Sequence, residues 1–169
     1  IYGGLSFYQR KEIKDILAYF RLTANNNDEE SLKRVINYPK RGIGKTTVDH
    51  ATVMASEKGV SMWEVISSPA EHPLPINNGA KAKLRDFVAM IQSFTVKLEQ
   101  ANAYELAQHI ASSCGMLKEL YADKTPEGIS RYENLQELLN GIKEFVDNTP
   151  EDEVRFLSDF LIDVALLTD

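Results

Sequence analysis

The side chains best suited by type and spacing to chemistry lie between positions 33 and 45. Five Lys or Arg residues fall there, no Asp or Glu does, and Gly42 and Gly44 stand just before a predicted helix. Glycine lets the backbone take a positive φ or approach a ligand closely, and the first N–H groups of a helix favour anions. The pattern predicts a phosphate-binding turn made by Lys40, Arg41, Gly42, Ile43, Gly44, Lys45, Thr46 and Thr47.

Three interpretations of this turn compete. Gly44-Lys45-Thr46 ends like a Walker A loop, but that motif needs a glycine where Pro39 stands and a buried strand leading in, so an ATP site is excluded. The second interpretation is a corner between two helices, whose glycines only permit the bend and whose charges are solvated. The third is a helix-hairpin-helix grip on nucleic-acid backbone.

The charge of the chain restricts what this turn can bind. The formal net charge is −6, with 19 Lys and Arg against 25 Asp and Glu, whereas a general nucleic-acid binder is basic. Because five of the 19 basic residues lie in one short stretch, the remaining surface should repel DNA. Any contact with DNA is therefore expected to be local and weak.

Length and composition bound the class of protein. The chain has 169 residues, 43% hydrophobic and 26% charged, which is ordinary for one globular domain that folds alone. No apolar run approaches the ~20 residues that span a bilayer, and no signal-peptide pattern is present, so we expect no membrane contact. The lack of an initiating Met predicts an excised piece, and the single Cys fits a reducing cytosol.

Apolar residues recur at helical spacing nearly throughout, which predicts an all-α, multi-helix domain of about eight helices. Residues 1–6 are predicted to form a short extended stub, the edge of a larger sheet. The predicted helices span 7–23, 29–36, 45–57, a short stretch capped by Ser61, 79–100, 104–120 with a break near Gly115, a stretch around 132–145, and a last helix capped by Thr149 that packs through Val154 and Leu157.

Other reactive side chains form no recognisable site. The Ser-Ser-Cys run at 112–114 has no His or carboxylate at a motif spacing, so helix packing is predicted there and no catalytic residue is assigned. The histidines at 50, 72 and 109 are too scattered for a metal site. Trp63 could stack on a base, but its apolar neighbours favour core packing.

The segment Asn37-Tyr38-Pro39-Lys40-Arg41-Gly42-Ile43-Gly44 resembles the N-x-P-x-R-G-I-G segment of UvrD/PcrA/Rep-type superfamily 1 DNA helicases. In that family the segment is called the GIG motif, lies in the inserted 2B subdomain and touches the backbone of the duplex ahead of the fork. Residues 3–15, 131–138 and 160–169 resemble further family segments in the family's order. The resemblance implies that residues 1–24 are the edge of the 2A motor domain and residues 25–169 the 2B helical subdomain.

The resemblance also implies a parent protein that is an ATP-dependent 3′-to-5′ DNA helicase. The ATPase motifs are absent from this chain, so we expect it to be inactive alone and to hold no cofactor, while ATP and Mg²⁺ act in the parent. Expected partners are duplex DNA backbone, the parent's motor domains and repair proteins, in the cytoplasm at the nucleoid. The alternative function is a helical protein-interaction module without DNA contact, and salt-sensitive duplex binding would separate the two.

Overall fold

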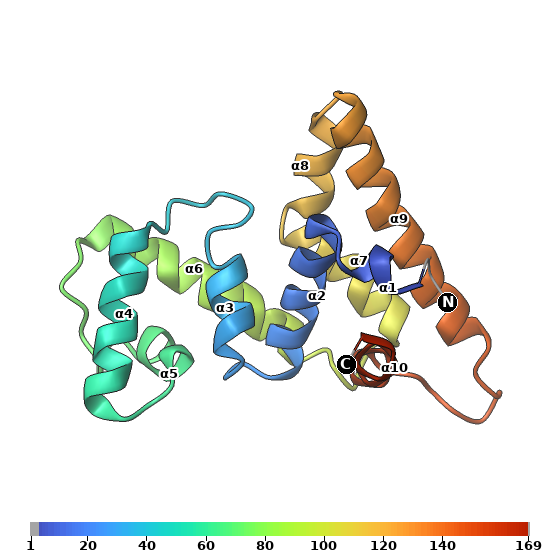
Figure 1. The fold of residues 1–169 in the computed structure, drawn as a ribbon. Coiled ribbons are helices and arrows are strands. Elements are labelled where there is room, and N and C mark those ends of the chain that lie inside the picture. The colour runs from blue at the N-terminus through green and yellow to red at the C-terminus, as the bar shows by residue number, and fades with distance from the viewer. Residues whose placement is uncertain (1–3, 169) are drawn as a thin grey trace.

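The computed structural model describes residues 4–168, and within them the chain forms ten helices and no strand (Figure 1). They are α1 (Gly4–Tyr8), α2 (Lys11–Ala24), α3 (Glu29–Val35), α4 (Lys45–Lys58), α5 (Met62–Ser67), α6 (Asn78–Thr95), α7 (Ala103–Ser113), α8 (Met116–Ala122), α9 (Pro126–Asp147) and α10 (Leu157–Thr168). The predicted all-α class is confirmed. Ten helices replace the predicted eight because the stretches 7–23 and 104–120 are each divided.

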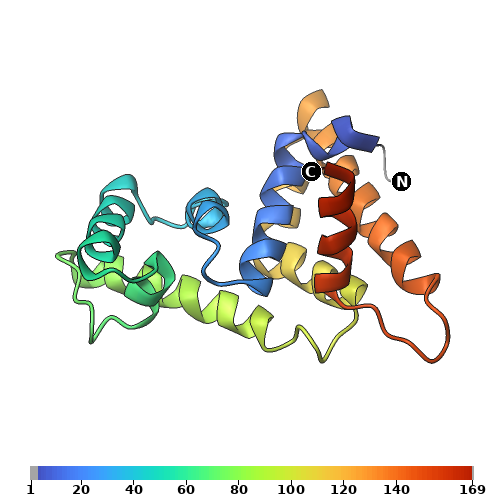
Figure 2. The same cartoon turned by 60° about the horizontal axis from the view of Figure 1, so that its bottom comes forward.

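Helix α2 lies at the centre of the fold and contacts α3, α6, α7, α9 and α10. In Figures 1 and 2, α4, α5 and the beginning of α6 form one side of the molecule, α7 to α10 form the other, and α2 and α3 lie between them. Ile13, Ile16, Tyr19 and Phe20 of α2 are fully buried. Figure 2 shows α6 running from the α4 and α5 side towards α2, so the long helix joins the two sides.

Several local signals read from the sequence are confirmed. Helix α4 ends at Gly59, which has the left-handed φ of 66° that glycine tolerates at a helix end. The Ser61 side chain accepts a hydrogen bond from the Glu64 N–H at 3.0 Å and so caps α5. Gly115, with φ of 94°, separates α7 from α8. Trp63 is 9% exposed and packs in the core, as expected.

The extended N-terminal stub is wrong for residues 4–6, which begin α1; residues 1–3 lie outside the described residues. Phe7 and Tyr8 of α1 are only 4% and 5% exposed, and α1 contacts α10. Burial of these two rings provides the stabilisation that the short segment lacks by itself. The helical conformation is interrupted at Arg10, whose backbone is extended, and α2 begins at the next residue.

The predicted start of the last helix at Thr149 is also wrong, because α10 begins at Leu157. The preceding segment is held by Arg155, whose carbonyl accepts a hydrogen bond from the N–H of Ala103 at 2.9 Å. Val154 is 59% exposed and does not pack as predicted. A long-range hydrogen bond to the first residue of α7 thus overrides the local helix-start signal.

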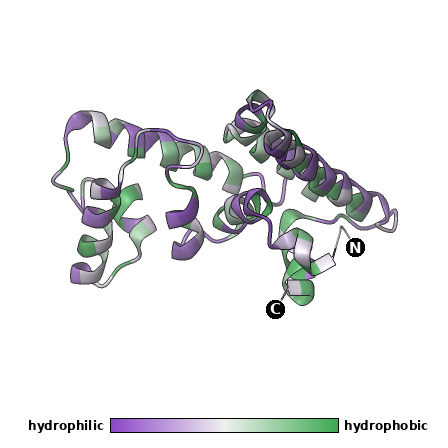
Figure 3. Ribbon diagram, turned by 45° about the horizontal axis from the view of Figure 1, so that its top comes forward, coloured by the Kyte–Doolittle hydropathy of each residue, from purple (hydrophilic) through white to green (hydrophobic). Residues whose placement is uncertain are grey.

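Helix α10 is mostly apolar and is coloured largely green near the C label in Figure 3. One face is buried through Leu157, Phe160 and Val164, whereas Ile162 and Leu166 are 59% and 81% exposed. Among the described helices, none combines the length and the apolarity needed to cross a membrane.

Candidate nucleic-acid interface

The predicted phosphate-binding turn, residues 40–47, consists of the end of the loop of residues 36–44, which joins α3 to α4, and the first three residues of α4. Asn37 closes this loop, because its side-chain Oδ1 accepts hydrogen bonds from the N–H groups of Arg41 at 2.9 Å and Ile43 at 3.1 Å. The Ile43 side chain is 2% exposed and packs in the core. The Ile43 N–H is therefore used inside the protein and its side chain anchors the loop.

The guanidinium of Arg41 points into the protein. Its Nη1 donates to the carbonyl oxygens of Val35 at 2.6 Å and Ile36 at 3.0 Å, and its Nη2 donates to the Tyr19 hydroxyl at 2.6 Å. The guanidinium carbon also lies 5.1 Å from the centroid of the Phe87 ring of α6. Sequence reasoning expected this side chain to meet phosphate, but the geometry gives it the role of tying α2, α3, α6 and the loop together.

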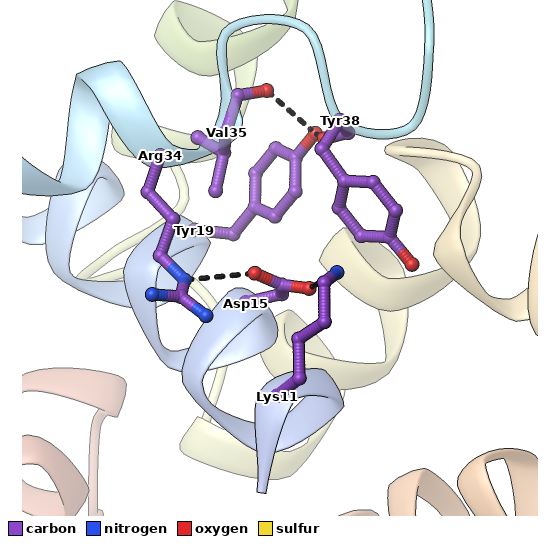
Figure 4. Close-up of polar contacts among 6 residues, drawn as sticks. All are labelled: Lys11, Asp15, Tyr19, Arg34, Val35 and Tyr38. Carbon is purple, nitrogen blue, oxygen red and sulfur yellow. Dashed lines mark hydrogen bonds and ion pairs between the residues drawn. The ribbon is translucent and has the colours of Figure 1, made fainter.

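A second polar cluster fastens α3 and the loop to α2 (Figure 4). The carboxylate of Asp15, whose side chain is 4% exposed, pairs with Arg34 Nε at 2.7 Å and Lys11 Nζ at 2.7 Å. The Tyr19 hydroxyl donates to the carbonyl oxygen of Tyr38. Arg34, one of the five basic residues of the stretch, is thus partly committed to an internal ion pair.

Tyr19 and Cys114 beside Arg41 are buried, and burial raises the pKa of both groups. Burial and then the nearby Cys114 raise the pKa of Tyr19 above its usual value, while the Arg41 cation opposes this shift. Burial raises the pKa of the Cys114 thiol to about 11. Burial and then the Glu119 carboxylate raise the pKa of Tyr38. In such surroundings a lost hydrogen bond is costly.

The start of α4 faces the other way. Gly44 is the N-cap residue, with no side-chain cap and an unstrained φ of −83°. A Cβ built on Gly44 would meet nothing within 4 Å. Within residues 4–168, the N–H groups of Gly44, Lys45, Thr46 and Thr47 make no hydrogen bond, although the Thr47 side chain is buried. The positive end of the helix dipole is therefore open to an anion.

Basic side chains occur in this helix end and in the loop that leads to it. Lys40 and Lys45 are exposed. Lys45 Nζ lies 2.7 Å from a carboxylate oxygen of Asp49 in a solvent-exposed ion pair. Lys83 of α6 joins them, because its Nζ lies 2.7 Å from where a Cβ of Gly42 would stand. Gly42 itself has a φ of 80°, which explains the glycine. Sequence reasoning missed Lys83, because only the packing of α6 beside the loop brings it there.

The remaining reactive side chains form no metal-binding cluster within the described residues. Over the part of the chain that the structure describes, no three His, Cys, Asp or Glu side chains are grouped as a metal ion would need. Of the run predicted to pack in a helix, Cys114 is 5% exposed and lies in the core, whereas Ser112 and Ser113 are exposed, so the prediction is wrong for the two serines. Ser113 Oγ and His109 Nδ1 lie 3.4 Å apart on the exposed face of α7, one helical turn from each other.

A family model and individual related proteins both identify this chain as similar to DNA helicases. The family described as the UvrD-like helicase C-terminal domain matches residues 1–169. The chain is 35% identical over 167 residues to the ATP-dependent DNA helicase PcrA of Staphylococcus aureus (strain Mu50 / ATCC 700699), and equally to that of Staphylococcus epidermidis (strain ATCC 12228 / FDA PCI 1200). Each alignment covers 99% of this chain and 22% of the relative, so the chain spans about a fifth of the length of these curated relatives.

Proposed function

Because the chain belongs to the UvrD-like helicase C-terminal domain family, we propose that it is the accessory duplex-binding part of an ATP-dependent 3′-to-5′ DNA helicase. In this proposal residues 1–24 form the edge of the 2A motor domain and residues 25–169 the 2B subdomain. ATP and Mg²⁺ are then bound elsewhere in the helicase, and the motor domains and repair proteins are its protein partners. The chain itself contributes the positioning of duplex DNA.

The observation that carries this proposal is the open N-terminus of α4. Four consecutive N–H groups from Gly44 to Thr47 lack partners within the described residues, and the space beside Gly44 is free. Phosphate oxygens satisfy such N–H groups and favour the positive end of the helix dipole. Lys40, Lys45 and Lys83 supply the charge that favours a polyanion over a small acid.

The proposed contact positions DNA without reading its sequence. Backbone N–H groups, helix ends and lysines bind phosphates and do not reach base edges. With two or three phosphates neutralised, the logarithm of the binding constant should fall with the logarithm of salt concentration with a slope of about −2 to −3. The acidic remainder of the surface keeps the affinity of the isolated chain near ~10⁻⁴ to 10⁻⁵ M.

The test is a titration of a fluorescent duplex with wild-type protein, Lys45→Glu and Gly44→Val at several salt concentrations. Lys143→Glu is the matched control, because Lys143 forms the same exposed pair four residues along a helix, with Asp147 at 2.9 Å on α9. Lys45→Glu should weaken binding roughly tenfold and make the salt slope shallower by about one. Lys143→Glu changes the net charge equally and should change binding much less.

Gly44→Val tests the close approach separately. Because Gly44 has an unstrained φ and free space around it, valine should leave the thermal stability nearly unchanged while its side chain holds phosphate away from the N–H groups. If wild type, Lys45→Glu and Gly44→Val give the same salt-insensitive titration curve, the chain does not bind duplex DNA here. A protein-interaction module would then be the better description.

A further inference from the structure

An apolar groove lies between α5, the loop of residues 68–77 and the side of α6 that faces away from Gly42. It encloses about 330 Å³ and is lined mainly by apolar side chains, including Val65, Ile66, Leu74, Ile76, Leu84 and Val88. This volume is at the lower end of those that hold ligands, roughly 300 to 1,000 Å³. Pro69 and Pro73 also line it, and their fixed φ values stiffen the loop wall. The groove is therefore formed before any ligand arrives.

The charged side chains of this groove are all cationic. Lys81 and Arg85 line it and are exposed, no Asp or Glu lines it, and neither cation forms an ion pair within the described residues. The chain as a whole carries a net charge of −6, whereas the charged side chains that line this groove are both cations. Their field favours a ligand with carboxylates next to its apolar part.

The groove also holds a buried polar side chain that makes no hydrogen bond within the described residues. His72 lines it, is 7% exposed, and neither ring nitrogen makes a hydrogen bond within residues 4–168. Its Nε2 lies 3.2 Å from a Glu64 carboxylate oxygen without hydrogen-bond geometry, and 4.0 Å from a Glu71 oxygen. The Glu64 carboxylate lies beside Nε2, whereas Nδ1 has no hydrogen-bond partner within the described residues; a buried polar atom left unsatisfied is costly, and an amide of a ligand in the groove would satisfy Nδ1.

Helical periodicity separates this groove from the proposed DNA contact. Lys81, Arg85 and Val88 recur at spacings that share one face of α6, whereas Lys83 is two residues from Lys81 and so points to the opposite face, beside Gly42. A ligand in the groove and a duplex at the loop can therefore be bound together.

We propose that the groove binds a peptide segment of a partner protein, in which one or two apolar side chains are flanked by Asp or Glu. The apolar side chains fill the groove, the carboxylates meet Lys81 and Arg85, and a polar group of the peptide reaches His72. Buried apolar anchors in a preformed pocket, with charges at its rim, are how peptide grooves obtain affinity and orientation.

The probe is a twelve-residue fluorescent peptide with leucine at every third or fourth position and glutamate between them. Two matched peptides replace every glutamate by lysine or every leucine by asparagine. Because a single shallow groove binds weakly, the titrations extend to about 1 mM protein. We expect only the first peptide to bind, and its amide chemical-shift changes in the isotope-labelled protein to lie in α5, residues 68–77 and α6. Equal binding of the lysine peptide, or shifts elsewhere, would overturn the proposal.

Protein variants complete the test. Arg85→Glu should weaken binding of the acidic peptide about five- to tenfold, since an attraction becomes a repulsion. Lys83→Glu, the same charge change on the other face of α6, should leave peptide binding unchanged and weaken duplex binding. Ala89→Trp, at an exposed position lining the groove, should block the peptide without changing charge.

The outcomes distinguish this inference from the duplex-binding proposal. Loss of peptide binding in Arg85→Glu and Ala89→Trp, with duplex binding kept, supports the groove whatever the loop does. Peptide binding unaffected by both variants rules the groove out, even if the loop binds DNA. Concentration-dependent dimerisation abolished by Ala89→Trp would assign the groove to a second copy of the chain and also overturn the proposal.

Discussion

The basic segment of residues 37–47 has an inner half and an outer half, each with a glycine and at least one lysine, and the two halves use their hydrogen-bond donors differently. In the inner half, residues 37–43, the donors of Arg41 and the N–H of Ile43 are used within the protein. In the outer half, Gly44 to Thr47, the backbone N–H groups have no partner within the described residues and the space beside Gly44 is open. The hydrogen bonds of the inner half fix the conformation of the loop. The N–H groups of the outer half remain available to an anion.

The comparison shows that charge alone does not identify a phosphate contact. Arg41 and Lys45 are four residues apart, yet Arg41 is surrounded by backbone carbonyls and rings and Lys45 by solvent. A rigid guanidinium fork suits several fixed acceptors, whereas a lysine is a flexible point charge. The difference predicts that substitutions of the inner-half groups that bond within the protein, Asn37 and Arg41, mainly change stability, whereas substitutions in the outer half mainly change binding.

The largest effect is expected for Arg41→Ala. It leaves the carbonyl oxygen of Ile36 without its donor, removes one of the donors to the Val35 carbonyl and the contact with the Phe87 ring, so the free energy of unfolding should fall by about 3 kcal/mol. Urea denaturation followed by circular dichroism measures this change. Lys40→Ala, one residue away and exposed, is the control and should change stability by less than about 0.5 kcal/mol.

Arg41→Lys separates the charge of Arg41 from its hydrogen bonds, because lysine keeps the positive charge but lacks the planar guanidinium with its several donors. If Arg41 mainly attracts DNA, Arg41→Lys should be as stable as wild type and bind nearly as well. If it mainly ties the loop to α2 and α6, Arg41→Lys should lose much of the stability that Arg41→Ala loses. The structure favours the second result.

High pH should produce the next largest loss of stability, through Cys114, whose carbonyl oxygen lies 3.4 Å from Arg41 Nη2. Burial raises the pKa of Cys114 from 9.0 to about 11, so the unfolded chain loses this proton at a lower pH than the folded chain. Stability from this group is complete below pH 9.0 and decreases as the pH rises towards 11, by about 2 to 3 kcal/mol in total. Tyr19, whose pKa burial also raises, should add to the loss at still higher pH.

Urea denaturation at pH 8, 9, 10 and 11 measures this loss. Cys114→Ala removes the titrating thiol, so its stability should decline less steeply over this range, whatever its stability at pH 8. Thr46→Ala, in the outer half and without a titratable group, should follow the wild-type pH dependence. Parallel curves for wild type and Cys114→Ala would show that the thiol does not contribute.

The two glycines provide the next smaller effect. Gly42 has a φ of 80°, so Gly42→Ala should cost about 1 to 2 kcal/mol of stability. The crowding by the end of the Lys83 side chain adds little, because that chain can move. Gly44→Ala has no such strain and should cost no more than about 0.5 kcal/mol, mostly because alanine is a poorer N-cap. Thermal melts of the two variants compare them directly, and equal losses would contradict the division of the loop.

The outer half of the basic segment is easier to predict from the sequence than the inner half. Glycine before a helix start, and the N–H groups that follow, are local features, and the structure has a helix starting at Lys45 with no side-chain cap. The direction of the Arg41 side chain and the arrival of Lys83 depend on how α2 and α6 pack around the loop. Local sequence does not contain that information.

The fold shows the same division between local and long-range causes. Helices with clear apolar periodicity or clear ends, such as α4 and α6, lie near their predicted positions. Errors occur at residues 4–6 and at Thr149, where packing against α10 and a hydrogen bond from Ala103 to Arg155 decide the conformation. The role of Asn37 had a usable signal, since Asn side chains commonly accept hydrogen bonds from nearby backbone in turns.

The smallest expected change in stability, and the finest test of the comparison, comes from Asn37→Asp. Asn37 holds the inner half through a single oxygen, Oδ1, which accepts from the N–H groups of Arg41 and Ile43. Aspartate keeps an oxygen there and strengthens it as an acceptor, so stability should stay within about 0.5 kcal/mol of wild type. Asn37→Ala loses both hydrogen bonds and should cost about 1 to 2 kcal/mol.

Duplex binding should separate these two variants in the reverse order. Asn37→Asp places a negative charge in the loop that leads into α4, and should weaken duplex binding about two- to fivefold at low salt, with the difference shrinking as added salt screens the charge. Asn37→Ala adds no charge, so its folded fraction should bind more tightly than Asn37→Asp. Urea denaturation and the fluorescent duplex titration, performed on both variants, give the four values needed. If Asn37→Asp is as unstable as Asn37→Ala, the single acceptor oxygen is not what closes the loop. If instead Asn37→Asp binds duplex as well as wild type at low salt, the phosphates do not lie near this loop.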